Sequence, residues 1–256
     1  MADLDLLTTY RRMFAAPEGE LVCWWYFGTC NVEVPGFPEM NVTAAETVMV
    51  YRSEDISEDA FRLTWWEVGY FRDPATGEIA DTWLNPVTGR TVKTPKLFEE
   101  GPAVLTITRD GAGVKVDLVQ AHAVIRGVDV TWKIEGDRVF LNQRERKARG
   151  LPRTDGTLPE EGASDASEGI TNLSIYAALA DVEGQESVAT CTGSYTFELA
   201  APAPWMGFDS DEGRMIIRGR MEKTAMNAIL NPIAWARLKQ LLPHAFDSDA
   251  LIPRWS

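Results

Sequence analysis

Histidine and cysteine are scarce in this chain, which has two histidines and three cysteines among 256 residues. A zinc site usually needs three or four His, Cys or carboxylate ligands, and Cys23, Cys30 and Cys191 show no metal-binding spacing. We therefore expect no metal site. The odd number of cysteines and the lack of a signal-peptide pattern favour reduced thiols and a cytoplasmic location.

Long apolar runs and an excess of basic charge are also missing. No segment approaches the roughly 20 apolar residues of a transmembrane helix, so we expect no membrane partner. The net charge of −13 argues against a nucleic-acid partner, because a phosphate backbone is met by a basic surface. The one basic cluster, Arg144 to Arg149, lies beside an acidic loop, and we interpret it as a solvated strand end.

Sequence motifs for common cofactors and nucleophiles are absent as well. The chain has no Gly-x-Gly-x-x-Gly fingerprint, no P-loop, no His-Glu-x-x-His and no Gly-x-Ser-x-Gly. Nicotinamide, nucleotide and haem cofactors are therefore unsupported. If the chain is an enzyme, we expect it to work without a cofactor, by acid–base chemistry.

Turn-forming residues, by contrast, occur twice in nearly the same pattern, at residues 73–77 (Asp-Pro-Ala-Thr-Gly) and 85–89 (Asn-Pro-Val-Thr-Gly). Each copy offers an Asx side chain that can bond its own backbone, a proline with preset φ and a glycine free to take positive φ. The flanking and intervening segments have strand composition. We therefore predict a three-stranded antiparallel meander over Phe61–Thr94.

Short strand-like runs continue along the rest of the chain, with turn signals between them. They predict a mainly β fold: an antiparallel, lipocalin-like barrel or highly curved sheet with short N- and C-terminal helices, forming one domain over residues 1–256. The segment 147–169 is rich in Gly, Pro and acidic residues, and we expect a mobile loop there that could act as a lid. The remaining expected elements are a helix over Leu4–Ala16, an acidic turn over Ser53–Asp59, a strand over Thr171–Ala180 and two short helices after Ala225.

Nine tryptophans are present, and most lie on or beside predicted strands. Neighbouring pairs such as Trp65 and Trp66 must point to opposite faces of a strand. Two interpretations stay open: the indoles fill a core and an interface, or they line a cavity for a flat apolar ligand.

Four motifs together resemble an uncharacterised bacterial family, the DUF1838 proteins. They are Trp-Trp-Tyr-Phe-Gly at 24–28, the segment 66–78, the turn at 85–89 and Ala-Pro-Trp-Met-Gly at 203–207. The resemblance implies a single β-rich, lipocalin-like barrel domain and no settled activity. Relatives among bacteria that degrade aromatic compounds imply an aromatic substrate.

The resemblance also singles out positions. Glu67, Tyr70, Asn85, Trp205 and Met206 fall on recurrent positions of the family. The chain departs from the pattern after the second turn, where many relatives carry a histidine and an Asn-Asp-Pro-Val stretch. Chemistry that relies on that histidine is not expected here.

Three residues on predicted strands are candidates for proton transfer: His122, Tyr70 and Glu67. A histidine has a pKa near ~6.5 and suits a general base at neutral pH. The alternative for His122 is a structural histidine bonded to a carbonyl in the core. Alternation places Glu67 and Tyr70 on opposite faces of one strand, so one of them is then structural.

Arginines on strands are candidates to hold an anionic substituent of a substrate, and we single out Arg72 and Arg218. The alternative for both is an ordinary surface ion pair. The other expected substrate contacts are Tyr51, Trp65, Trp83, Asn85, Trp205 and Met206.

These observations lead to one functional hypothesis and two alternatives. The hypothesis is a cofactor-independent lyase that cleaves a C–C bond of a small aromatic or phenolic compound, such as a lignin-derived one, with loss of formaldehyde or carbon dioxide. One alternative is a lipocalin-like protein that binds an apolar aromatic ligand without chemistry. The other is a structural protein whose tryptophans form a homodimer interface.

Overall fold

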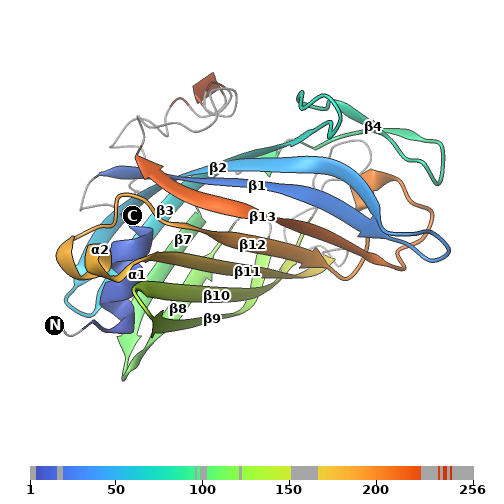
Figure 1. The fold of residues 1–256 in the computed structure, drawn as a ribbon. Coiled ribbons are helices and arrows are strands. Elements are labelled where there is room, and N and C mark those ends of the chain that lie inside the picture. The colour runs from blue at the N-terminus through green and yellow to red at the C-terminus, as the bar shows by residue number, and fades with distance from the viewer. Residues whose placement is uncertain are drawn as a thin grey trace.

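The computed structural model describes residues 4–15, 20–95, 97–98, 103–120, 123–150, 167–225, 236, 239–240 and 243. Antiparallel strands dominate these residues, in agreement with the predicted fold class (Figure 1). The elements are α1 (Leu6–Phe14), β1 (Leu21–Glu33), β2 (Met40–Ser57), β3 (Ala60–Arg72), β4 (Thr82–Leu84), β5 (Thr91–Lys93), β6 (Leu97–Phe98), β7 (Ala103–Asp110), β8 (Gly113–Val119), β9 (Ala123–Glu135), β10 (Arg138–Arg149), β11 (Ser167–Ala178), α2 (Leu179–Gly184), β12 (Thr192–Leu199), η1 (Pro204–Met206) and β13 (Arg214–Ala225).

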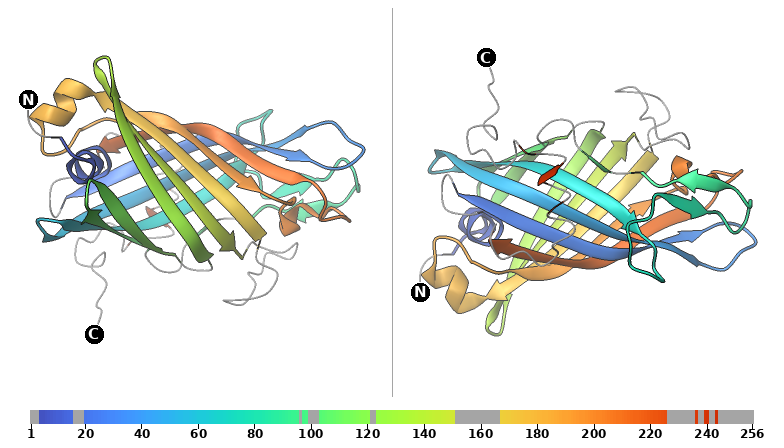
Figure 2. Two further views of the ribbon diagram at one scale, coloured as in Figure 1. Left: turned by 90° about the horizontal axis from the view of Figure 1, so that it is seen from below. Right: turned by 90° about the horizontal axis from the view of Figure 1, so that it is seen from above.

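The main sheet is nearly closed into a barrel, and its strands run in the order β8-β7-β3-β2-β1-β13-β12-β11-β10-β9. Most neighbours are consecutive in the chain, as hairpins require, but β1 pairs with β13 and so joins the two ends of the strand sequence. Figure 2 shows the two halves of the sheet facing each other across the interior. Closure leaves few strand edges open to other chains.

Helix α1 closes one end of this barrel (Figure 2). It begins at the N-cap Asp5, whose carboxylate accepts from the Thr8 amide at 2.7 Å. Its buried face presents Tyr10 and Phe14 to the interior, where Phe14 stacks on Trp24 with ring centroids 4.7 Å apart. The predicted N-terminal helix is therefore confirmed, and its apolar face is what holds it in the barrel.

The tryptophan pairs point to opposite faces, as alternation predicts. Trp24 and Trp65 lie in the interior cluster of apolar side chains. Trp25 and Trp66 belong to a second buried cluster on the outer face of β1, β2 and β3. The outer indole of Trp25 donates to Glu46 at 2.7 Å, which satisfies a buried N–H outside the barrel.

Both copies of the repeated turn fold alike. The side chains of Asp73 and Asn85 each accept from the two amides that lie two and three residues further on, at 2.7–3.1 Å. Gly77 and Gly89 have φ of 73° and 69°, which a residue with a Cβ rarely adopts. The turn chemistry predicted from the sequence is confirmed.

The predicted three-stranded meander over Phe61–Thr94 is wrong. β4 pairs only with β5, in a separate two-stranded sheet, and the segment after the first turn touches β3 through one isolated bridge between Arg72 and Ile79. The reason lies at the edge of β3, which is already occupied by β6 and β7.

Three smaller expectations also change. Ser53–Ser57 continues β2 in place of the acidic turn, and the strand expected up to Ala180 ends at Ala178, where α2 begins. Both ends of the expected 147–169 loop are strand, because β10 runs to Arg149 and β11 begins at Ser167. The middle of that loop and nearly all of the expected C-terminal helices lie outside the described residues. No helix in the described part of the chain is long and apolar enough to cross a bilayer.

A buried lysine from β13 caps the C-terminal end of α1. Lys223 is 2% exposed, and its ammonium donates to the carbonyls of Arg12 and Ala15 and to the Ser187 hydroxyl. These carbonyls belong to the helix end, where intrahelical partners run out. Burial lowers the pKa of Lys223 from 10.5 to about 8.

This lysine predicts a pH-dependent contribution to stability. Between pH 8 and 10.5 the unfolded chain holds the Lys223 proton and the folded chain does not, so unfolding takes up a proton. The free energy of unfolding of the wild type minus that of Lys223→Met should therefore rise with pH across this interval, by up to roughly 3 kcal/mol. Urea unfolding at several pH values measures the difference, with Lys115→Met on the surface as the control. A difference that stays flat or falls with pH would contradict this assignment.

Candidate functional site

The barrel interior contains a cavity of about 140 Å³. It extends between Phe14, at the end closed by α1, and Trp205, at the opposite end, and it is lined by residues from both halves of the sheet. Apolar and aromatic side chains form most of its wall, among them Leu105, Leu173 and Ile217. An engineered apolar cavity of about 150 Å³ in another protein holds one benzene molecule, so this one has room for about a single ring.

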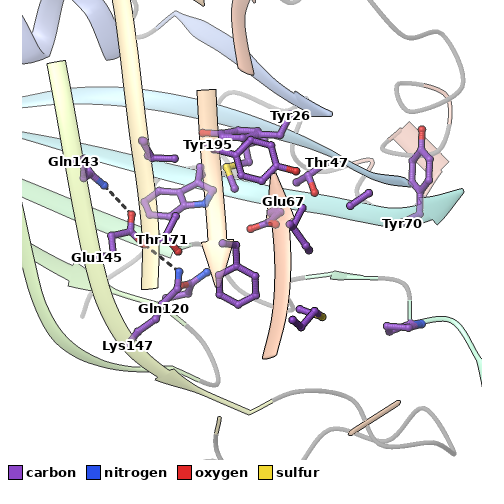
Figure 3. Close-up of a pocket in the computed structure, with 18 of the residues that line it drawn as sticks. Tyr26, Thr47, Glu67, Tyr70, Gln120, Gln143, Glu145, Lys147, Thr171 and Tyr195 are labelled. Carbon is purple, nitrogen blue, oxygen red and sulfur yellow. Dashed lines mark hydrogen bonds and ion pairs between the residues drawn. The ribbon is translucent and has the colours of Figure 1, made fainter. Parts of the chain in front are cut away.

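One wall of the cavity carries a row of buried polar side chains on β10. Gln143, Glu145 and Lys147 are two residues apart, so all three project inward, and none is more than 8% exposed (Figure 3). Gln143 donates to Glu145 at 2.7 Å, and the Lys147 ammonium contacts Glu145 at 3.0 Å and Gln120 at 3.2 Å. The row continues to α1, because the Tyr10 hydroxyl bonds the Gln143 carbonyl oxygen.

A second acidic group, Glu67, reaches the cavity from β3 (Figure 3). It is 6% exposed and lies among three tyrosines of the cavity wall. Tyr26 and Tyr51 are buried, and Tyr195 is partly buried. Burial, with a further contribution from the Glu67 carboxylate, raises the pKa of each tyrosine above its ordinary value. All three phenols therefore stay protonated at neutral pH and can donate hydrogen bonds.

Trp65 contributes an aromatic surface and a polar atom to the same wall. Its ring stacks on Tyr51, with centroids 5.2 Å apart and an interplanar angle of 21°. The side chain is buried, yet its indole N–H has no hydrogen-bond partner. A buried donor without an acceptor is costly, which makes this atom a candidate contact for a bound ligand.

The end opposite α1 is closed by η1, which the second copy of the repeated turn holds in place. The Asn85 amide donates to the Met206 carbonyl at 2.9 Å, and the Thr88 hydroxyl donates to the Gly207 carbonyl at 3.2 Å. Trp205 packs on Phe71 from β3, with centroids 5.0 Å apart. Two motifs separated by more than a hundred residues thus build one lid-like wall over the cavity.

The predicted proton-transfer residues end up in different places. Glu67 lies in the cavity, as a catalytic residue must. Tyr70 borders the cavity, but its ring packs in the outer cluster beside Glu46 and points away from Glu67 (Figure 3). The two residues therefore project from opposite faces of β3, as alternation predicts. His122 lies outside the described residues.

The predicted arginine contacts are not brought to the cavity. Arg72 pairs with Glu46 at 2.8 Å on the outer face and donates to the Gly77 carbonyl, so it anchors the first turn. Arg218 is 52% exposed and lies 3.7 Å from Glu39. Alternation directs both side chains away from the interior. The alternative given for these arginines, an ordinary ion pair, therefore describes both of them.

Among the other expected substrate contacts, Tyr51, Trp65 and Trp205 line the cavity. Trp83 packs edge-on against Trp205, with ring centroids 6.1 Å apart, and Met206 is fully buried in the same apolar cluster. Asn85 is fully buried and is occupied by the turn and by the Met206 carbonyl. These three residues support the cavity wall and are absent from its described lining.

Sequence reasoning missed the polar row on β10, since the segment 144–149 was interpreted as a solvated strand end. That interpretation holds for Arg144 and Arg146, which are exposed, and is wrong for Glu145 and Lys147. Alternation along the strand could have indicated this row, because it places Gln143, Glu145 and Lys147 together on one polar face. No group of three or more metal-ligating side chains occurs among the described residues.

Comparisons with known proteins identify a family without a described function. Residues 19–100 match the family described as "Protein of unknown function (DUF1838)", which confirms the resemblance predicted from the sequence. No curated protein matches the chain. Among solved structures, "Crystal Structure of Rv2717c from M. tuberculosis" is similar at 14% identity and a TM-score of 0.24, over 80% of this chain and 98% of that one.

The ion pair on β10 predicts non-additive mutational effects. Lys147→Met leaves the buried Glu145 carboxylate without its cation and should destabilise the chain by about 3–5 kcal/mol. Adding Glu145→Gln removes the stranded charge, so the double variant should recover part of that loss. Urea unfolding of the two single variants and the double variant measures the coupling, and strictly additive losses would contradict a buried pair.

The anchoring of η1 predicts a loss of stability in Asn85→Ala. This change removes the acceptor of the turn and the donor to the Met206 carbonyl, and it should cost about 2 kcal/mol. Asp73→Ala, in the exposed first copy of the turn, is the matched control and should cost less, because its backbone amides can bond water. Equal losses in the two variants would argue against a special role for the second turn.

Proposed function

We propose that this protein is a cofactor-independent enzyme that binds a small aromatic or phenolic compound in the barrel cavity and cleaves a C–C bond by acid–base chemistry, with loss of formaldehyde or carbon dioxide. One observation carries the proposal: carboxylates from two different walls, Glu67 and Glu145, project into an aromatic-lined interior. Carboxylates are expensive to bury, and unusual ones in a cavity are typical of functional sites.

The proposed chemistry needs only one acid and one base. For a hydroxymethyl phenol, an acid adds a proton to the ring carbon that carries the group, and a base removes the hydroxyl proton. The C–C bond then breaks, its electron pair returns to the ring, and the former hydroxyl oxygen leaves as the carbonyl of formaldehyde. Loss of carbon dioxide from an aryl carboxylic acid follows the same steps: the ring carbon gains a proton, the carboxyl group loses one, and the electron pair of the broken C–C bond returns to the ring.

The residues available for these steps are Glu67 on one wall and the Glu145–Lys147 pair on the other. A ring held between them would have one proton-transfer group on each side. The three tyrosines of the wall suit a different role, because their raised pKa values keep them neutral. They would donate hydrogen bonds to an oxygen that gains negative charge.

The cavity volume limits the substrate. About 140 Å³ suits a single substituted ring, so a diaryl compound would bind only if its second ring displaced the wall around Trp205. Compounds with one ring are therefore the first to test.

A non-catalytic binding protein is the second candidate function. The observation in its favour is the mostly apolar lining together with the unpartnered Trp65 N–H, which a ligand could satisfy without reacting.

Turnover of hydroxymethyl and carboxyl phenols distinguishes the two functions. The proposal predicts release of formaldehyde or carbon dioxide in proportion to substrate consumed, and Glu67→Gln should lower kcat by about 100-fold or more. Asp129→Asn, which removes the same charge from the outer surface, is the control and should retain activity. Stoichiometric binding of unaltered ligand, with no product from any compound, would support the binding protein and refute the enzyme.

A further inference from the structure

The ion pair on β10 keeps hydrogen-bonding capacity beyond the contacts that hold it in place. Each oxygen of the Glu145 carboxylate accepts one hydrogen bond, from Gln143 at 2.7 Å and from the Lys147 ammonium at 3.0 Å. A carboxylate has about four lone-pair sites, so acceptor sites remain on both oxygens. The ammonium has three N–H groups and, among the described residues, two acceptors, Glu145 and Gln120. One donor on Lys147 therefore remains next to acceptor sites on Glu145.

The strands beside Lys147 do not take up this remaining donor. In the ladder, Lys147 lies opposite Ile125 on β9 and Gly169 on β11, and neither residue has a side chain that can accept a hydrogen bond. Glu145 and Lys147 both line the cavity, and they are only 8% and 6% exposed (Figure 3). Their remaining capacity is therefore available to a molecule in the cavity and is shielded from bulk water.

Buried partners fix both charged groups. The Tyr10 hydroxyl bonds the Gln143 carbonyl oxygen, which leaves the Gln143 amide N–H to donate to Glu145. The carbonyl oxygen of Gln120 accepts from the Lys147 ammonium at 3.2 Å. Tyr10, Gln143 and Gln120 are themselves buried. The pair is thus held in one arrangement before a ligand arrives, and such preorganisation lowers the entropy that binding would otherwise lose.

A donor next to an acceptor matches a ligand group that accepts and donates through one atom. A hydroxyl does both, because its O–H can donate to Glu145 while its oxygen accepts from Lys147. An ether oxygen only accepts, and a methyl group does neither. A hydroxyl on a single ring therefore fits both the pair and the size of the cavity.

We infer that the Glu145–Lys147 pair is a hydroxyl-binding subsite, and that it takes the hydroxyl of a single-ring aromatic alcohol. The inference rests on the proposed function, because it concerns the same cavity and reaction. Within that reaction Glu145 takes the hydroxyl proton, and Lys147 stays hydrogen-bonded to the oxygen as negative charge develops on it. The C–C bond then breaks, the oxygen becomes the carbonyl oxygen of formaldehyde, and the electron pair returns to the ring, which gains a proton from the acid on the facing wall.

The subsite is tested with three probes of nearly the same size: benzyl alcohol, anisole and ethylbenzene. Isothermal titration calorimetry at neutral pH should show that benzyl alcohol, which both donates and accepts, binds the wild type most tightly. In the double variant Glu145→Gln/Lys147→Met, benzyl alcohol should lose at least about tenfold in affinity, and ethylbenzene should stay within about threefold. Glu145→Gln alone should change the affinities in the same direction, so the test does not depend on how well the double variant folds.

A matched control lies on the outer face of the same strands. Arg146 on β10 pairs with Asp129 on β9 at 3.0 Å, and both side chains are about half exposed. The double variant Asp129→Asn/Arg146→Met removes this outward pair and should leave all three affinities unchanged. Absence of benzyl alcohol binding to the wild type, equal or tighter binding of anisole or ethylbenzene, or equal losses for all probes in the Glu145 variants would overturn the inference.

The two proposals can fail separately. Selective binding of benzyl alcohol that the Glu145 variants lose, without formaldehyde or carbon dioxide from any phenol, would uphold the subsite and refute the proposed enzyme. Turnover that persists in Glu145→Gln, without a preference for benzyl alcohol, would leave the enzyme in place and refute the subsite.

Discussion

The antiparallel pairing of β1 with β13 is the constraint on which the rest of the structure depends. It runs over twelve residue pairs, from Val22 with Ala225 to Glu33 with Arg214, and joins the first long strand to the last. Because this pairing curls the sheet back on itself, the inward side chains of β3 and β10 face a common interior although they lie in opposite halves. Without it, Glu67 and the Glu145–Lys147 pair would belong to two separate surfaces, and no cavity would connect them.

The barrel interior buries polar and charged side chains at a cost in folding free energy. A barrel of this size could be filled with apolar side chains, yet β10 buries a carboxylate, an ammonium and an amide, and the buried Gln120 adds a second amide beside them. Replacing such groups with apolar ones is often neutral or stabilising. A functional role therefore explains their presence better than a contribution to stability does. The outer carboxylate of Glu46 is the useful contrast. It is equally buried, but the Trp25 indole and Arg72 satisfy it and fix the first turn to the barrel, which is a structural task.

The repeated turn shows how one local motif can take two roles. Both copies form the same Asx-stabilised loop with a glycine at positive φ. The first copy lies at the surface, whereas the second carries a buried asparagine whose amide reaches η1 and holds Trp205 over the cavity. Asn can do this and Asp cannot, because only the amide has a donor to offer once its oxygen is used by the turn.

The sequence by itself determined the fold class, the N-terminal helix, the two turns and the faces of the tryptophan pairs, because all of these follow from local rules: capping, preset φ, and the period of two along a strand. It also placed Glu67 and Tyr70 on opposite sides of one strand. Only the tertiary structure decided which side was the interior, since that depends on how the sheet curls, and curling is set by the distant pairing of β1 with β13. For the same reason Arg72 and Arg218 could be identified as strand arginines but not as outward ones. The polar row on β10 was visible in the sequence as alternation. Only the tertiary structure shows that this row lines a cavity, because the facing strands enclose it.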